Sequence, residues 1–273
     1  MHTKIKNTNH EYHTGDGVSK SDLDLLHTCP AKYRYRKDNP EEIETPALLF
    51  GSMVHKLILE PEDFETEFAV APECDRRTKA GKAIFEEFAA KAGNRKIIAA
   101  ADFETAKAMR DAVMAHPKAS KLMTGGETET SYYWIDDRTG VLCKCRPDKV
   151  NLGYIIDLKT TEDASCEGFS RSMYNYRYHV QAAWYLKGYE AVTGEKPAGF
   201  VFVAVEKKPP HEVAIYITND VTLDLGAKEA AADLDVYAAC AASGNWYGYG
   251  GETNDVMTID LPAWAIKRKE LMA

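Results

Sequence analysis

The sequence predicts an α/β fold in which a mixed sheet, built on a three-strand meander with additional strands, is flanked by helices. Three observations predict it. Apolar residues recur at helical spacing in residues 18–125, the spacing changes to strand-like alternation between residues 128 and 160, and helical and strand-like segments alternate after residue 179. No linker rich in Pro, Gly or Ser divides the chain, so we expect one domain over residues 1–273.

The composition is that of a globular protein with a substantial core. Of the 273 residues, 45% are hydrophobic and 28% are charged, which excludes disorder, fibres and disulfide-stabilised miniproteins. The formal net charge of -8 gives no overall attraction to nucleic acid or to anionic membranes, although local basic clusters can still bind phosphate. No apolar run reaches the roughly 18 residues that a membrane helix needs, so we expect no membrane role.

The six cysteines show neither a disulfide pattern nor a complete metal-binding pattern. None forms a CxxC pair, and the first residues are polar and His-rich instead of an apolar signal segment, so we expect a cytoplasmic protein with free thiols. Cys143 and Cys145 lie two apart on an expected strand and could form half of a zinc site. Because no second Cys or His pair completes such a site, we interpret them as packed thiols.

The N-terminal region is expected to be mainly helical. Residues 1–17 form a polar, turn-like lead, and residues 18–125 form a helical N-terminal part. A helix begins at Ser19 or Ser21, either of which can act as its N-cap, and Pro30 interrupts it.

Two further segments of this part predict helices. Residues 48–59 have the apolar pattern of an amphipathic helix, which Pro61 ends. Residues 76–116 are rich in Ala, Lys and Glu and predict two helices. The break between them is expected at Gly93 and Asn94.

Residues 126–218 are expected to hold the sheet and the helix that packs on it. Short apolar-alternating segments separated by turn residues predict the meander, with strands at residues 128–135, 141–150 and 154–160. A helix follows from about residue 179 to residue 193, and Gly194 closes it.

The remaining elements complete the sheet and the C-terminal region. Residues 200–205 are apolar and β-branched and predict a buried strand, and residues 211–218 alternate as an edge strand. Residues 219–273 are expected to form a C-terminal helix and tail, with the helix over residues 223–242.

Two carboxylates and a lysine on the meander predict a metal-dependent hydrolytic site. Asp148 stands near the end of the second expected strand, and a tight turn joins that strand to the third, so Asp148 and Asp157 can come close enough to share a divalent metal. Oxygen ligands of this kind suit Mg²⁺ or Mn²⁺. Residues two apart in a strand share a face, so Lys159 would lie beside a metal-bound water.

Three more side chains have functional and structural interpretations. Gln181 and Tyr185 are four apart in an expected helix, so they share a face and can point together at the end of the sheet. His55 lies on a mostly apolar helix face. The structural alternatives are a core histidine bonded to backbone, an ordinary helix face with a half-buried tyrosine and, for the two aspartates, turn caps and surface ion pairs.

Together these motifs resemble the signature of the PD-(D/E)XK nuclease superfamily. Pro147-Asp148 followed by Asp157-Leu158-Lys159 matches the signature, Gln181 to Tyr185 resembles the QxxxY element of its RecB-like branch, and Gly51 to His55 resembles the GxxxH element of that branch. Nearly the whole chain resembles the nuclease domains of the RecE (exonuclease VIII) family. The segments that carry this narrower resemblance are residues 18–21, 30–33, 143–149 and 176–181.

The resemblance implies a restriction-endonuclease-like core and a specific activity. The implied activity is 5′ to 3′ digestion of double-stranded DNA to mononucleotides, which leaves 3′ single-stranded overhangs for single-strand annealing recombination. The implied cofactor is Mg²⁺, for which Mn²⁺ can substitute. The implied metal ligands are His55, Asp148, Asp157 and the backbone carbonyl of Leu158. The implied catalytic residues are Lys159, Gln181, Tyr185 and Glu129, the last in the first meander strand at an acidic position of related phage exonucleases.

The resemblance also implies partners. It implies a ring-shaped homo-oligomer, with a tetramer favoured over a trimer, that encloses double-stranded DNA with a free end, and a RecT-type single-strand annealing protein. An acidic exterior with Lys and Arg concentrated in a channel would fit the net charge. The candidate DNA-binding residues are Lys20, Lys32, Arg34, Arg36, Arg76, Arg77, Arg146 and Arg177.

Two other functions use the same motifs. One is an endonuclease of restriction or repair type with the same site, since end-dependence is not encoded in the motif. The other is a DNA-binding module that keeps the fold and no longer cuts. The lack of a four-cysteine set argues against the iron–sulfur nucleases of the superfamily.

Overall fold

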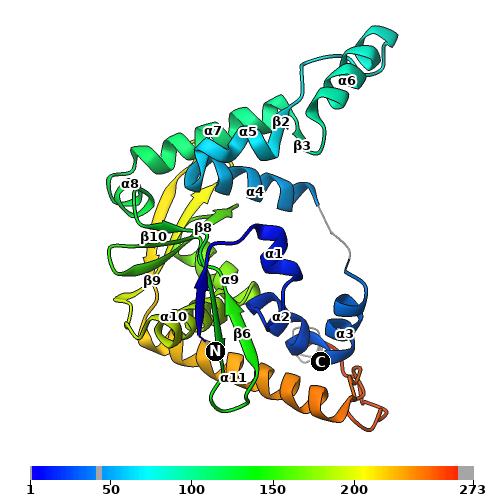
Figure 1. Ribbon diagram of the computed structural model, residues 1–273, viewed down its shortest axis with the longest axis vertical. Coiled ribbons are helices and arrows are strands. Elements are labelled where there is room, and N and C mark those ends of the chain that lie inside the picture. The colour runs from blue at the N-terminus through cyan, green and yellow to red at the C-terminus, as the bar shows by residue number, and fades with distance from the viewer. Residues whose placement is uncertain (1, 41–44, 264–273) are drawn as a thin grey trace, which may run out of the picture. The chain divides into compact units, whose positions relative to one another are not determined.

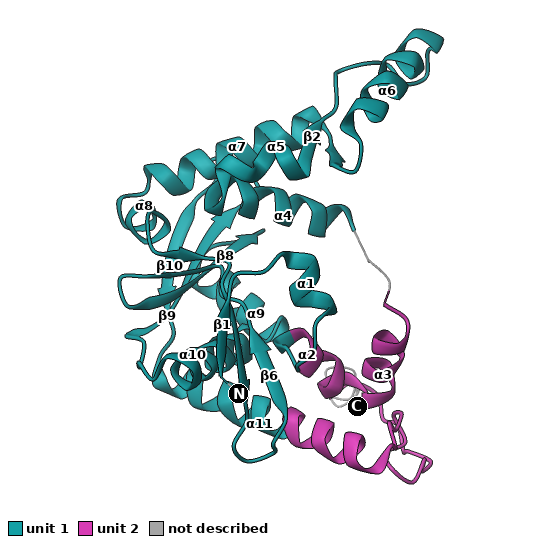
Figure 2. Ribbon diagram, viewed as in Figure 1, with its two compact units in different colours: residues 1–20, 42–232 teal, residues 21–41, 233–273 magenta. Residues whose placement is uncertain are grey.

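The computed structural model describes residues 2–40 and 45–263 (Figure 1). The chain divides into two compact units, one of residues 1–20 and 42–232 and the other of residues 21–41 and 233–273 (Figure 2). The single domain expected over residues 1–273 stays a prediction. No helix among the described residues is long and apolar enough to cross a membrane.

The larger unit is built around a five-stranded mixed sheet, as expected for the α/β class. Its strands are β4 (Glu127–Thr128), β7 (Lys149–Asn151), β8 (Tyr154–Thr161), β9 (Gly199–Glu206) and β10 (Val213–Ile217). Their order is β10-β9-β8-β7-β4, with β8 and β9 parallel and every other pair antiparallel. Two helices connect β8 to β9, which is the long crossover that parallel neighbours require.

Helices cover both faces of this sheet. On one face α4 (Pro46–Leu59) and α7 (Ala100–Ala115) pack over Ile156 and Leu158 of β8. On the other face α9 (Cys166–Asn175) and α10 (Tyr178–Thr193) pack over Ile155. Because side chains alternate along a strand, Asp157 and Lys159 lie on the face of β8 that α9 and α10 cover.

A second sheet of the larger unit packs against α10. It has the order β1-β5-β6, and its strands are β1 (Thr3–Ile5), β5 (Ser131–Ile135) and β6 (Leu142–Cys145). The ring centroids of Trp134 and Trp184 lie 4.9 Å apart. Gly188 allows the close approach of helix and sheet, since a Cβ atom there would lie 2.5 Å from the Trp134 ring.

The first two strands of the expected meander each divide in two. The segment 128–135 gives the end of β4 and then β5, with a break at Glu129, whose φ is 49°. The segment 141–150 gives β6 and then β7, with a break around Pro147, which has no N–H to donate to a ladder. The N-terminal halves and C-terminal halves of these segments therefore belong to different sheets, which the alternation pattern does not reveal.

The lead over residues 1–17 is more regular than expected. It contains β1, which pairs antiparallel with β5, and the helix α1 (Asn9–Thr14). A reciprocal capping box between Thr8 and Glu11 stabilises the start of α1. The polar composition of this lead did not indicate either element. In particular, β1 is an edge strand with little burial, so it lacks the apolar alternation that predicts a strand.

The helical part is confirmed with additions. The expected helices over residues 48–59 and 76–116 appear as α4 and as α6 (Lys79–Ala92) with α7. Between these last two lies β3 (Lys96–Ile98), which pairs parallel with β2 (Phe68–Val70). The other added elements are the 3₁₀ turn Pro61–Asp63, α5 (Phe64–Glu67) and α8 (Pro117–Met123).

In the described part of the chain, the smaller unit contains helices from near the N-terminus and the end of a later helix. Most of α2 (Lys20–Thr28), the whole of α3 (Pro30–Asp38) and the end of α11 (Asp220–Ser243) belong to it. Tyr33 packs with Tyr237 and Trp246, with ring centroids 5.7 Å and 5.2 Å away. The part of the expected tail beyond residue 263 lies outside the described residues.

The cysteines are free thiols, as expected. All six lack disulfide bonds, and Cys143 and Cys145 are fully buried. Burial raises the pKa of the Cys143 thiol to about 12, so it is neutral at physiological pH. Both residues are confirmed as packed thiols.

Candidate active site

Three potential metal ligands from separate segments converge at one end of the five-stranded sheet. His55 lies on α4, Glu129 lies in the break between β4 and β5, and Asp148 immediately precedes β7. Each offers one ligand atom, and these atoms all lie within 4.8 Å of one another. The Nδ1 atom of His55 is 3.5 Å from the Oδ2 atom of Asp148. The sequence prediction that His55 and Asp148 come together is therefore met in the geometry.

Asp148 is positioned by the neighbouring strand. Its Oδ2 atom accepts a hydrogen bond of 2.7 Å from the backbone N–H of Leu158. The pairing of β7 with β8 ends at Lys149, which is opposite Ile156. The Asp148 carboxylate therefore accepts from an N–H that lies beyond the end of the ladder. The N–H and C=O of one strand residue point to the same side, so the carbonyl of Leu158 also faces the side of Asp148.

Glu129 is held by backbone and charge. Its N–H donates to the carbonyl oxygen of Asp148 at 3.1 Å, and its Oε2 atom lies 2.7 Å from Nε of Arg146. Burial and the Asp148 carboxylate raise the pKa of Glu129 to about 8, against the opposing effect of Arg146. Glu129 was expected within a strand; it lies in a strand break with positive φ, and this places it in the cluster.

Asp157, Lys159 and Gln181 form a network beside the cluster, in which the aspartate and the glutamine are buried and the lysine is half-buried. The Nζ atom of Lys159 is 2.6 Å from Oδ1 of Asp157 and donates to Oε1 of Gln181 at 3.1 Å. The side-chain amide of Gln181 donates to Oδ2 of Asp157, which closes the network. Only 1% of Asp157 is exposed. The three-ligand cluster does not include Asp157, so its role as a metal ligand stays a prediction.

The network shifts the pKa of both ionisable members. Burial is the main reason that the pKa of Asp157 rises to about 6; Lys159 opposes this rise and Asp148 adds to it. Burial acts to lower the pKa of Lys159, but the Asp157 and Asp148 carboxylates outweigh it, so the pKa of Lys159 is raised. Lys159 therefore remains a cation at neutral pH.

Two tyrosines of α10 lie near this network. Tyr185, which was predicted for the site, packs edge-on against Phe200 at 6.2 Å, and burial raises the pKa of its hydroxyl. Tyr178, which was not assigned to the site, has its ring 4.5 Å from Nζ of Lys159. The available signal was its position three residues before Gln181, which gives both side chains one helix face.

The candidate DNA-binding residues of the larger unit already have partners. Arg146 contacts Glu129, Lys20 donates to the carbonyl of Tyr176 at 2.7 Å, and Arg177 contacts Glu229 at 3.2 Å. The two arginines before α6 also have partners, since Arg76 lies 3.8 Å from the Phe85 ring and Arg77 pairs with Asp75. Their role in DNA binding stays a prediction.

The basic residues of α3 belong to the smaller unit. Arg34 forms an ion pair with Asp38, and Lys32 lies over the ring of Tyr249 at 5.2 Å. Arg36 is exposed. Their role in DNA binding also stays a prediction.

The donor set fits a hard divalent cation. Two carboxylates and one imidazole at this spacing are ligands that Mg²⁺ or Mn²⁺ accepts, and Glu129 and Asp148 are kept close in spite of their mutual repulsion. The residues that would hold the ion are His55, Glu129 and Asp148, with Asp157 and the Leu158 carbonyl as further predicted ligands. Such an ion would acidify a water molecule and polarise a phosphate. The Lys159 cation, paired with Asp157, would then supply a second positive charge.

Comparisons with known proteins identify a family and a structure of similar fold. No curated protein matches the chain. A crystal structure of a candidate exonuclease from Eubacterium rectale is similar in fold, with a TM-score of 0.63 and 16% sequence identity over 96% of this chain and 98% of that one. Residues 19–257 match a family described as a PDDEXK-like domain of unknown function. The chain therefore belongs to this PDDEXK-like family, DUF3799.

Proposed function

We propose that this chain is a metal-dependent exonuclease that degrades double-stranded DNA from the 5′ end, releases mononucleotides and leaves 3′ single-stranded overhangs. One observation carries the proposal: His55, Glu129 and Asp148 converge within 4.8 Å, with Lys159 held close by through Asp157 and Gln181. This combines a potential cation site with a fixed ammonium group, two features that can promote phosphodiester hydrolysis.

The network supports a chemical role for Lys159. Because its pKa is raised, Lys159 keeps its protons and is suited to orient a water molecule and to stabilise the negative charge that develops on the phosphate. It is not suited to remove a proton at neutral pH. Gln181 fixes the lysine through its Oε1 atom, so Gln181 acts as a positioning residue.

The finer features of the proposal rest on resemblance. The sequence motifs resemble those of RecE-type exonucleases, and a structure of similar fold is described as that of a candidate exonuclease. We include in the proposal Mg²⁺ as the natural ion, a ring-shaped homo-oligomer around duplex DNA, and a RecT-type annealing protein as the recombination partner. The basic side chains named above are the proposed contacts to the DNA backbone.

The test uses a linear duplex labelled separately at its 5′ and 3′ ends, with a closed circular duplex alongside, in Mg²⁺ and in EDTA. The expected result is early release of the 5′ label as mononucleotide, an intact circle and no activity in EDTA. A Lys159→Ala variant is the inactive control, and a Glu190→Ala variant, changed at an exposed position of the same unit, is the active control.

Other outcomes would contradict the proposal in distinct ways. Cutting of the circle would favour an endonuclease of restriction or repair type. Early release of the 3′ label would reverse the polarity. Failure to cut any substrate with Mg²⁺ or Mn²⁺ would favour a non-cutting DNA-binding module.

A further inference from the structure

A row of two stacked tyrosines runs from the half-buried Lys159 to the surface of the larger unit. The Tyr178 ring lies 4.5 Å from Nζ of Lys159. The Tyr176 ring stacks on Tyr178, with ring centroids 5.5 Å apart and an interplanar angle of 27°. Tyr178 is half-buried, whereas 62% of Tyr176 is exposed. An exposed aromatic surface therefore lies two short contacts from the proposed catalytic cation.

The row is held in place at both ends. Phe169 and Phe202 pack on the Tyr178 ring, with centroids 6.1 Å and 5.7 Å away. The backbone of Tyr176 is fixed because its N–H donates to the carbonyl of Ser172 and its own carbonyl accepts from Lys20. A ring with these supports loses little conformational entropy when a ligand stacks on it.

We propose that Tyr176 stacks on an unpaired nucleobase of the DNA strand that is being cut, close to the phosphate that Lys159 serves. This inference rests on the proposed function and specifies its substrate: the strand must be separated from its complement before it reaches the site. Aromatic side chains bind unpaired bases in this way whatever the base sequence.

The surroundings favour a nucleotide over an apolar partner. The inner end of the row is the Lys159 cation, and a second cation, Lys20, bonds to the backbone of the outer tyrosine. A nucleotide combines an aromatic base with a phosphate anion and so complements a tyrosine beside cations. An apolar peptide segment has no anionic group to place beside these cations.

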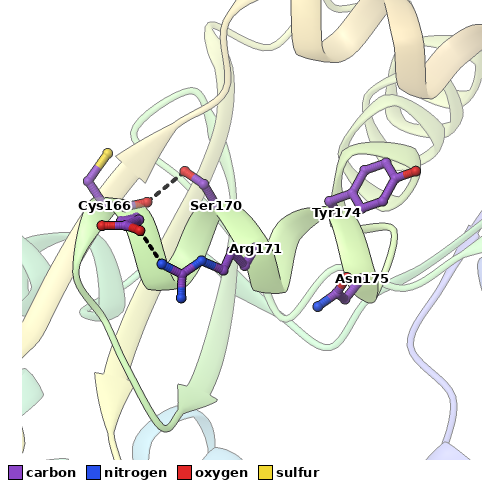
Figure 3. Close-up of a pocket in the computed structure, with 6 residues that line it drawn as sticks. Cys166, Ser170, Arg171, Tyr174 and Asn175 are labelled. Carbon is purple, nitrogen blue, oxygen red and sulfur yellow. Dashed lines mark hydrogen bonds and ion pairs between the residues drawn. The ribbon is translucent and has the colours of Figure 1, made fainter. Parts of the chain in front are cut away.

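Tyr174 provides a matched control. It lies on the same stretch of chain and is 72% exposed, but its ring is parallel to His179 at 6.4 Å and does not belong to the row. Figure 3 shows it on α9, where it lines a surface pocket with Cys166, Ser170, Arg171 and Asn175. Removing Tyr174 therefore removes an exposed tyrosine from this region and leaves the stack on Lys159 intact.

The experiment measures binding of single-stranded oligonucleotides in EDTA, where no cutting is expected, by fluorescence anisotropy. A set of oligonucleotides with one abasic nucleotide moved along the strand is compared on the wild type, Tyr176→Ala, Tyr176→Phe and Tyr174→Ala. Tyr176→Ala should weaken binding of the intact strand about 5- to 100-fold. Tyr176→Phe should remain within about twofold of the wild type, because the stacking face is kept.

The abasic series gives the decisive comparison. At one position, the abasic strand should bind the wild type as weakly as the intact strand binds Tyr176→Ala, and combining the two changes should cause no further loss. Equal losses for intact and abasic strands at every position would overturn the proposal. So would no loss in Tyr176→Ala, or the same position-specific effect in Tyr174→Ala.

The same proteins separate this inference from the proposed function. In Mg²⁺, each protein is tested on a duplex with a frayed end and on a fully paired duplex. The ratio of the two cutting rates should be larger for Tyr176→Ala than for the wild type. If the wild type cuts no DNA and the abasic comparison still succeeds, the exonuclease proposal fails and the stacking site stands. If the wild type cuts normally and the abasic comparison fails, only the stacking site is lost.

Discussion

The backbone N–H of Glu129 donates to the backbone carbonyl of Asp148 at 3.1 Å, at the point where two chain segments pass from one sheet to the other. This bond joins two of the three converging ligands through main chain rather than through side chains. Both carboxylates therefore start from fixed backbone positions. The fold keeps the two carboxylates close together against their mutual repulsion, and a divalent cation would reduce that repulsion.

Replacing Glu129 should weaken metal binding. Glu129→Gln keeps the size of the side chain and removes one negative ligand, so Mn²⁺ affinity measured by calorimetry should fall at least about tenfold, since even residues that only support ligands cause losses of that size. Glu127→Gln is the matched control, because Glu127 lies two residues away and pairs with Lys4 on the surface. Equal affinities for Glu129→Gln and the wild type would remove Glu129 from the site.

Stability without metal should fall as the pH rises. The folded-state pKa of Glu129 is raised to about 8, so between its ordinary value near 4.5 and about 8 the folded state binds more protons than the unfolded state. The free energy of unfolding in EDTA should therefore decrease over this range. Denaturant titrations at several pH values should show a smaller decrease for Glu129→Gln, since the substitution removes this group and keeps the others.

Metal should counteract that loss at the upper end of the range. An ion that binds only the folded state raises the free energy of unfolding in proportion to the logarithm of its concentration above Kd. At pH 8, Mn²⁺ should therefore stabilise the wild type more than Glu129→Gln. An identical pH dependence in the two proteins, with and without metal, would contradict this account of the carboxylate.

Asp157→Asn should abolish most of the nuclease activity and leave duplex binding in place. The substitution keeps the volume of a residue that is 1% exposed but removes the charge that lies 2.6 Å from Lys159. The rate of cutting should fall about 100-fold or more, the size of loss seen when one electrostatic group of a site is removed. Gel-shift assays in EDTA and thermal melts show whether DNA binding and folding persist. Mg²⁺-dependent cutting at the wild-type rate would eliminate this site.

Gln181→Ala should lower the turnover number more than it changes substrate binding. Gln181 contacts both Asp157 and Lys159, and losses of about 10- to 100-fold are typical when such supporting groups are removed. Glu190→Ala, at an exposed position of the same helix, should retain wild-type kinetics. A change in KM alone would assign Gln181 to DNA binding instead of positioning.

Two glycines should respond in opposite ways to alanine. A Cβ atom on Gly188 would lie 2.5 Å from the Trp134 ring and 2.8 Å from Sγ of Cys145, so Gly188→Ala should destabilise the protein by about 1–3 kcal/mol. A Cβ atom on Gly51, inside α4, would meet nothing within 4 Å, so Gly51→Ala should stabilise it by roughly 0.5–1 kcal/mol. Denaturant unfolding of both variants measures the difference, and shifts of the same sign would contradict the packing described here.

The sequence predicted the elements whose signals are local. The helix α4 has Pro46 in its first turn and ends at Leu59, close to the expected bounds, and α10 ends at Gly194 in the left-handed conformation. Elements that depend on distant partners were missed. The strand β1 is defined only by its pairing with β5, and the breaks at Glu129 and Pro147 appear only when the two segments join different sheets.

In the candidate site, too, the sequence predicted the contacts that depend on local periodicity and missed the one that depends on distant segments. Asp157 and Lys159 share a strand face, and Gln181 reaches both of them, as strand and helix periodicity indicated. The sequence could not show that Asp157 is engaged by Lys159 and Gln181 while Glu129 takes a place among the converging ligands. The place of Glu129 among the ligands depends on the positive φ of that residue, which a pattern of apolar spacing does not indicate.

The strand β1 has a consequence for handling the protein. It covers the outer edge of β5, pairing Lys4 with Tyr132 and Ile5 with Ser131. Removing residues 1–5 would leave a row of open backbone donors and acceptors on β5, a surface that recruits strands from other molecules. Forms that lack residues 1–5 should therefore self-associate through that edge.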